Sequence, residues 1–127
     1  MNREARLALR PVPASAAQAR QFVERTLGDW GCDGLVDLAR LLVSELVTNA
    51  VLHARTDLEL AIGLRRGGVR VEVTDGSPAA PVKRSYEDEA MTGRGLALVD
   101  ELADRWGVDE RADGKAVWFE VDEQLGR

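Results

Sequence analysis

The spacing of apolar residues predicts three helices in this chain. The first begins with Ser15 as its N-cap and is ended by Gly28 and Gly31. The second runs from about Leu35 to Ala54, and the third covers Leu96–Ala103. In the second helix we expect one stripe to face the core, made of Leu38, Leu41, Leu42, Leu46 and Ala50.

Alternation of apolar and polar residues, although weak in Arg6–Arg10, predicts strands in the rest of the chain. The expected strands are Arg6–Arg10, 57–66, 69–73, Trp106–Asp109 and 116–121. The pair Gly67-Gly68 is typical of a hairpin turn between two of them. The fold class that follows is an α/β two-layer sandwich, in which an antiparallel-rich mixed sheet is covered on one face by three helices.

Polar side chains interrupt the second predicted helix on one face. Glu45, Asn49 and His53 are spaced by four residues, so they line up beside the apolar stripe rather than opposite it. A carboxylate and a carboxamide at the margin of a core need partners, because unpaired burial costs about 2–7 kcal/mol per polar group. Taken alone, this helix fits two interpretations equally well: a site for a metal with a phosphate chain, or a polar pair satisfied within the protein.

Composition narrows the classes of function. The 127 residues form one domain, residues 1–127, and acidic side chains outnumber basic ones 22 to 17. Lysine and arginine form no long run, so nucleic acid is not an expected partner. Neither a signal peptide nor a membrane-spanning apolar stretch is apparent, so we expect a cytoplasmic location and no membrane partner. The single cysteine, Cys32, is expected to be a small buried hydrophobe.

Two short glycine motifs flank a long aperiodic segment. Asp75-Gly76 ends a strand that we expect to be buried, where a carboxylate can face a ligand and glycine permits its close approach. A Gly-Arg-Gly motif at 93–95 precedes the third helix, whose first N–H groups could bind phosphates. Each motif alone is weak evidence, since Asp-Gly is a common turn and the second motif lacks a P-loop pattern. The segment between them, Ala79–Met91, is expected to be a mobile connection with a function.

The order and spacing of these features resemble the N, G1 and G2 boxes of the GHKL ATP-binding fold, the family of gyrase and the histidine kinases. The resemblance rests on the E-x3-N-x3-H helix, the hairpin, the strand ending in Asp-Gly, the aperiodic segment and the Gly-x-Gly before a helix. It covers about Ala14 to Val121. Two stretches, SELVTNAVLHA and TGRGLALVDELADRWGV, are most similar to the small anti-sigma-factor serine/threonine kinases of the RsbW and SpoIIAB type.

The resemblance implies a role for each polar residue of the second helix. Asn49 would hold Mg²⁺ through its side-chain oxygen, with the metal bridging the triphosphate of ATP. Glu45 would be the general base that removes a proton from the attacking hydroxyl. His53 would close this face of the nucleotide site, through a structural hydrogen bond rather than in catalysis.

The glycine motifs would bind the rest of the nucleotide. By the resemblance, Asp75 would accept a hydrogen bond from the adenine amino group, and Gly76 would let the base approach. The phosphate end of the site would be formed by the residues that open the third helix: Gly93, Arg94, Gly95 and Leu96. The two glycines would donate backbone N–H groups, and the arginine would either neutralise phosphate charge or remain an exposed loop residue. Ala79–Met91 would be the lid.

Two departures from the family's pattern bear on nucleotide affinity. Ser77-Pro78 stand where the family often has a further glycine, and a proline stiffens this hinge. The family also tends to place a threonine near the adenine at the start of its last strand. The stretch here is Gly-Lys-Ala-Val, residues 114–117. Loss of one buried hydroxyl typically costs about 1 kcal/mol of binding.

We therefore expect an ATP- and Mg²⁺-dependent enzyme, a protein serine/threonine kinase. It would phosphorylate an anti-sigma-factor antagonist and bind a sigma factor. The alternative is a non-catalytic, nucleotide-gated module that sequesters a regulator; the presence of Glu45 favours the kinase, and the two departures favour the module. A histidine kinase would need a phosphoacceptor histidine elsewhere, and His53 is the only histidine. A homodimer is an expectation from the family alone.

Overall fold

The computed structural model describes residues 3–77 and 95–123 of the chain. Its helices and strands, in chain order, are β1 (Glu4–Leu9), α1 (Ser15–Asp29), the 3₁₀ turn η1 (Asp33–Leu35), α2 (Val36–His53), β2 (Leu58–Arg65), β3 (Gly68–Asp75), α4 (Gly95–Leu102), β4 (Arg105–Arg111) and β5 (Gly114–Asp122). Every helix and strand expected from the sequence is present, with ends that shift by a residue or two.

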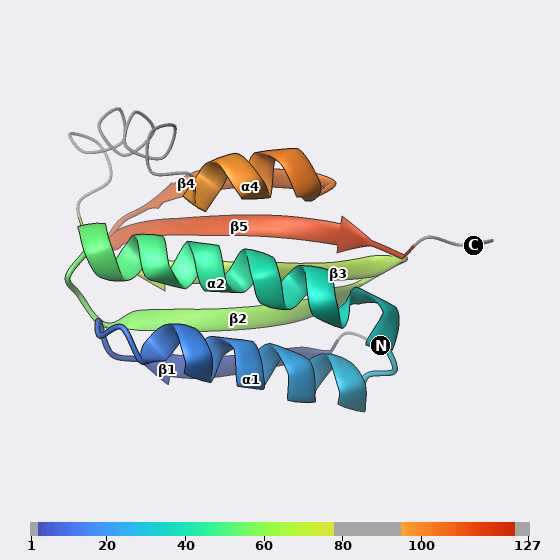
Figure 1. The fold of residues 1–127 in the computed structure, drawn as a ribbon. Coiled ribbons are helices and arrows are strands. Elements are labelled where there is room, and N and C mark those ends of the chain that lie inside the picture. The colour runs from blue at the N-terminus through green and yellow to red at the C-terminus, as the bar shows by residue number, and fades with distance from the viewer. Residues whose placement is uncertain (1–2, 78–94, 124–127) are drawn as a thin grey trace.

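The five strands form one sheet in the order β1-β2-β3-β5-β4. Helices α1, α2 and α4 cover one face of it, which confirms the two-layer α/β sandwich (Figure 1). All four strand pairs of the described chain are antiparallel, so the expected mixed character of the sheet is not found there. The register aligns Leu58, Asp75 and Lys115 side by side across β2, β3 and β5.

The core lies between the helices and the inner face of the sheet. Alternate strand residues point into it, as a period of two requires, and the most deeply buried of them are Leu60, Ile62, Val71, Val73, Phe119 and Val121. The opposite face of the sheet is polar. On that face the Arg70 guanidinium lies 4.1 Å from the centre of the Trp118 ring and 3.3 Å from carboxylate oxygens of Glu72 and Glu120.

Two sequence predictions about the helices are wrong. Ser15 is the first residue of α1 and not its N-cap, because its fully buried hydroxyl donates a 2.6 Å hydrogen bond to the backbone oxygen of Arg10. Leu41 is 42% exposed and does not belong to the core stripe. The reason is that α2 packs against α1, β3 and α4 at once, so it buries a broad band rotated away from Leu41. That band contains Ala39, Leu42, Val43, Leu46, Val47 and Ala50.

The residues that end α1 have the conformation and the hydrogen bond that are typical of a helix C-terminus. Gly31 has a φ of +75°, the left-handed conformation that ends many helices and that glycine adopts without strain. The Cys32 N–H donates back to the Leu27 oxygen at 2.8 Å, which completes the cap. Cys32 itself is 6% exposed, so the prediction of a small buried hydrophobe is confirmed.

Candidate functional site

Three of the predicted motifs meet at one end of the molecule. The C-terminal end of α2, the end of β3 and the start of α4 all lie there, at the left of Figure 1. Helix α2 packs against both β3 and α4. Motifs that are far apart along the chain therefore border the same region.

The polar face of α2 has the arrangement that its spacing predicts. Asn49 is 5% exposed, whereas Glu45 and His53 are half-buried on the preceding and following turns. Within residues 3–77 and 95–123 the Glu45 carboxylate has no hydrogen-bond or ion-pair partner, whereas Asn49 and His53 each take part in at least one interaction. A half-buried carboxylate without a partner is available to a ligand or to a proton, which a satisfied structural pair is not.

The end of β3 contains a buried polar cluster of Asp75, Ser77 and Lys115. The Lys115 ammonium lies 3.2 Å from Oδ2 and 3.3 Å from Oδ1 of Asp75, and both side chains are 2% exposed. Ser77 donates to Oδ1 twice, from its backbone N–H at 2.9 Å and from its hydroxyl at 2.6 Å. The Lys115 ammonium also donates to the Ser77 hydroxyl oxygen at 2.5 Å. Asp75 therefore points inward, as predicted, but it already has partners.

The backbone brings these side chains together. Asp75 and Lys115 are directly opposite each other in the β3–β5 register, and both face the helices. Gly114, just before Lys115, has a φ of +152°, and a Cβ there would collide with the backbone oxygen of Asp75. Only glycine allows this close approach of the two strands.

Gly76 follows Asp75 at the surface. Its N–H donates to the Thr56 hydroxyl at 2.9 Å, which ties the end of β3 to the segment before β2. A Cβ at Gly76 would make only ordinary contacts with the protein, so the described chain does not itself require glycine here. The predicted role of Gly76, to let a base approach, stays a prediction.

The phosphate end of the predicted site is described only in part. Helix α4 begins at Gly95, one residue before the expected start, and the Leu96 side chain is 2% exposed in the core. Only the backbone of Leu96 can therefore serve a ligand. Gly93, Arg94 and the predicted lid, Ala79–Met91, lie outside the described residues.

Sequence reasoning missed the role of Lys115. The position stood out because it lacks the family's threonine, and not because of the lysine that occupies it. A signal was present, because alternation along β5 places Lys115 on the same face as Val117, Phe119 and Val121. A lysine on an apolar face needs a carboxylate near it.

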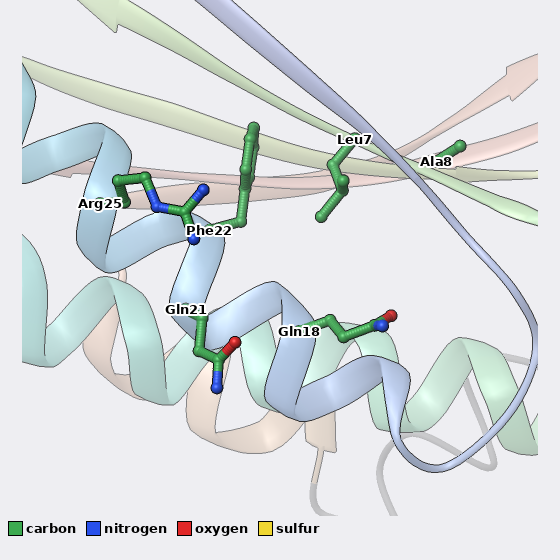
Figure 2. Close-up of a pocket in the computed structure, with 6 residues that line it drawn as sticks. All are labelled: Leu7, Ala8, Gln18, Gln21, Phe22 and Arg25. Carbon is green, nitrogen blue, oxygen red and sulfur yellow. The ribbon is translucent and has the colours of Figure 1, made fainter.

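Two hollows are lined entirely by residues that the structure describes. One of about 410 Å³ opens at the ends of β2 and β3; it is lined by Asp75 and Gly76 but by no residue of the polar face of α2. A second, of about 230 Å³, lies between β1 and α1 (Figure 2) and is lined by Leu7, Ala8, Gln18, Gln21, Phe22 and Arg25. It contains none of the predicted site residues.

The donor atoms on α2 suit a hard cation. A carboxamide oxygen and a carboxylate, one turn apart, are the ligand types that Mg²⁺ prefers. A magnesium ion that is bound mainly by phosphates needs only one or two protein oxygens. Asn49 fits that requirement with its amide oxygen, which leaves the Glu45 carboxylate to accept a proton. The part of the chain that the structure describes holds no cluster of three histidine, cysteine or acidic residues.

The fold and the placement of its polar residues define a domain of the GHKL-type ATPase class. A family profile described as a histidine kinase-like ATPase domain matches residues 9–121. The chain is also similar to an uncharacterised protein of Streptomyces coelicolor, with 37% identity over 82 residues, which cover 59% of this chain and 76% of the relative. The chain belongs to the histidine kinase-like ATPase domain family, and this membership supports an ATP-binding regulatory function. No helix in the described residues is long and apolar enough to cross a membrane.

Proposed function

We propose that this chain is an ATP-dependent protein serine/threonine kinase that phosphorylates an anti-sigma-factor antagonist and binds a sigma factor. The observation that carries the proposal is the Glu45 carboxylate, half-buried and without a partner in the described chain, one turn before the buried Asn49. A purely structural carboxylate at this depth would be expected to have a hydrogen-bond or ion-pair partner.

In the proposed reaction Glu45 takes the proton of a serine or threonine hydroxyl on the antagonist. The hydroxyl oxygen forms a bond to the γ-phosphorus of ATP, the bond from that phosphorus to the β-phosphate oxygen breaks, and ADP leaves. Asn49 would hold Mg²⁺, which neutralises phosphate charge when it is bound with the nucleotide. Asp75 would accept a hydrogen bond from the adenine amino group.

The test compares the wild type with Glu45→Gln and Asn49→Ala, using Mg²⁺, ATP and the antagonist protein co-purified from host cells. Because general-base catalysis contributes about 10²–10⁴-fold, Glu45→Gln should lose transfer by that factor while its ATP affinity changes little. Asn49→Ala should also lose Mg²⁺-dependent nucleotide binding. Glu101→Gln, at an exposed position of α4, is the matched control and should transfer phosphate like the wild type.

One observation favours the second candidate, a non-catalytic module that sequesters a regulator when nucleotide is bound. The Asp75 carboxylate already accepts hydrogen bonds from Lys115 and Ser77. The adenine base would therefore have to share this carboxylate with donors of the protein. This sharing favours modest nucleotide affinity. If the wild type binds ATP but transfers no phosphate to its antagonist, the kinase proposal fails and the module remains.

A further inference from the structure

The outer side of β1, which we call the β1 edge, has backbone groups that no described strand uses. Strand β1 is the first in the order of the sheet, so β2 pairs with only one of its two sides (Figure 1). The Leu64 N–H donates to the Arg3 oxygen at 2.9 Å, and in an antiparallel ladder every second residue is bonded in this way. The N–H and C=O groups of the residues in between therefore point away from β2. These exposed residues are Glu4, Arg6 and Ala8.

This edge is less protected against pairing than the opposite edge of the sheet. Folded proteins discourage the addition of strands by charged side chains, prolines, bulges or a covering element. Strand β1 pairs with β2 in a continuous register of six residues, and its two charged side chains, Glu4 and Arg6, form an ion pair with each other. The opposite edge strand, β4, has four exposed charged residues in seven: Arg105, Asp109, Glu110 and Arg111.

The hollow between β1 and α1 lies beside the β1 edge. Leu7 and Phe22 form its apolar part, and Arg25 and two glutamines of α1 form its polar rim (Figure 2). Its volume of about 230 Å³ is below the roughly 300–1,000 Å³ of pockets for small molecules, so it suits a single side chain. In a strand added to β1, the residue opposite Leu7 would belong to a non-hydrogen-bonded pair, whose side chains lie close together. That residue would place its side chain in the hollow.

The charges at this edge favour an acidic partner. The chain as a whole has a net charge of −5, yet the Arg25 guanidinium at the hollow and the Arg10 guanidinium after β1 have no hydrogen-bond or ion-pair partner among the described residues. A carboxylate in the hollow would form a charge-assisted hydrogen bond with Arg25. A second copy of this chain would bring the same arginines to the edge. The exposed residues of α1 are also polar, whereas homodimer interfaces are mainly apolar.

We propose that the β1 edge binds an extended acidic segment of a partner protein, which adds to the sheet as an antiparallel strand. The backbone of Glu4, Arg6 and Ala8 forms the hydrogen bonds that hold the segment, and a glutamate side chain enters the hollow and pairs with Arg25. This binding is independent of the proposed function, because neither β1 nor the hollow contains a residue of the candidate nucleotide site.

The probe is the blocked heptapeptide Thr-Val-Thr-Glu-Thr-Val-Thr, whose alternation places the glutamate and both valines on one face. Millimolar peptide, titrated into ¹⁵N-labelled protein, should give saturable NMR shifts of the amides of β1 and α1. Arg25→Met should weaken binding about fivefold, because the ion pair with the glutamate is lost. A peptide with glutamine in place of glutamate should bind the wild type and Arg25→Met equally weakly. Arg111→Met removes a cation from the other edge strand and is the control that should change nothing.

The peptide backbone tests whether a strand is added. The two threonines beside the glutamate direct their N–H groups at β1, so N-methylation of both should abolish binding, whereas N-methylation of the two valines should have little effect. In the protein, Ala8→Pro should abolish binding as well. Its pairing with β2 should persist, because the N–H of residue 8 faces the free edge, and circular dichroism checks that the variant is folded.

The peptide experiments use folded wild-type protein, so they decide the question even if a variant does not fold. Absence of saturable shifts in β1, or equal binding of the two N-methylated peptides, would overturn the proposal whether or not the chain binds ATP. An equal loss of the glutamate and glutamine peptides in Arg25→Met would overturn the acidic specificity. If sedimentation shows a wild-type dimer that Ala8→Pro converts to a monomer, a second copy occupies the β1 edge and the proposal fails.

Discussion

Replacing Asp75 by asparagine should destabilise the fold as well as affect nucleotide binding. Asparagine keeps an acceptor oxygen for the two Ser77 donors, so the main loss is the negative charge opposite Lys115. Both side chains of this pair are 2% exposed, so the buried ammonium would lose its contact with the Asp75 carboxylate. Removing one partner of a buried ion pair costs about 3–5 kcal/mol, a large part of the 5–15 kcal/mol that stabilises a typical domain.

Urea unfolding, followed by tryptophan fluorescence, measures this loss. With a slope of about 2 kcal/mol per molar urea, the midpoint of Asp75→Asn should fall by roughly 1.5–2.5 M. The double variant Asp75→Asn/Lys115→Met removes both charges and should recover most of the loss, because a neutral pair of similar volume is often as stable as the ion pair. Arg6→Met is the control. It breaks an exposed pair with Glu59, 2.7 Å apart, and should shift the midpoint far less.

The double variant decides whether the reasoning holds. If its destabilisation equals the sum of the two single effects, Asp75 and Lys115 are energetically independent and the buried pair is not what stabilises the end of β3. If Asp75→Asn unfolds at the wild-type midpoint, the ammonium has found water or another acceptor, and the burial argument fails. A coupling of about 2 kcal/mol or more supports it.

Three further predictions concern other parts of the chain. Gly114→Ala should lower the free energy of unfolding by more than about 3 kcal/mol, because the added Cβ would collide with the Asp75 carbonyl oxygen. Gly34→Ala is the control: open space surrounds this position, so the urea midpoint should change little. Equal effects of the two substitutions would contradict the steric argument. A hydrogen bond from an arginine of β4 lowers the pKa of Glu120. The ionised Glu120 therefore stabilises the fold above pH 4.5, and this contribution is lost on acidification. Urea midpoints measured from pH 6 to 3 should fall less steeply in Glu120→Gln than in the wild type. Burial raises the pKa of the Cys32 thiol, so alkylation at pH 8, followed by mass spectrometry, should be much slower in native than in urea-unfolded protein, and similar rates would show that the residue is accessible.

The helices and strands could be predicted from the sequence because their local patterns are strong. Alternation in β2, β3 and β5 and the helical stripe of α2 each reflect burial of one face, and the structure retains those faces. The two errors concern residues whose role depends on tertiary contacts and not on local spacing. Ser15 bonds to the end of β1 instead of capping α1, and Leu41 is exposed because α2 has neighbours on several sides. Neither feature can be predicted from the spacing of residues along the chain.

Some features of the candidate site could likewise be predicted from the sequence, and others could not. Glu45, Asn49 and His53 could be aligned from their spacing, since four residues along a helix return to one face. The pairing of Asp75 with Lys115 could not, because it joins residues 40 apart and depends on the register of β3 against β5. Alternation along β5 could show that Lys115 faces inward, but only the register identifies its partner.

Because Asp75 is paired with Lys115, a family resemblance alone does not establish what Asp75 does in this chain. By the resemblance, Asp75 would bind the adenine base; in the structure it forms an ion pair with a buried lysine and accepts a hydrogen bond from the backbone of Ser77. A loss of ATP binding in Asp75→Asn would therefore not distinguish a lost hydrogen bond to adenine from a disordered strand end. The unbonded Glu45 carries no such double role in the described chain, so its substitution reports on chemistry more directly.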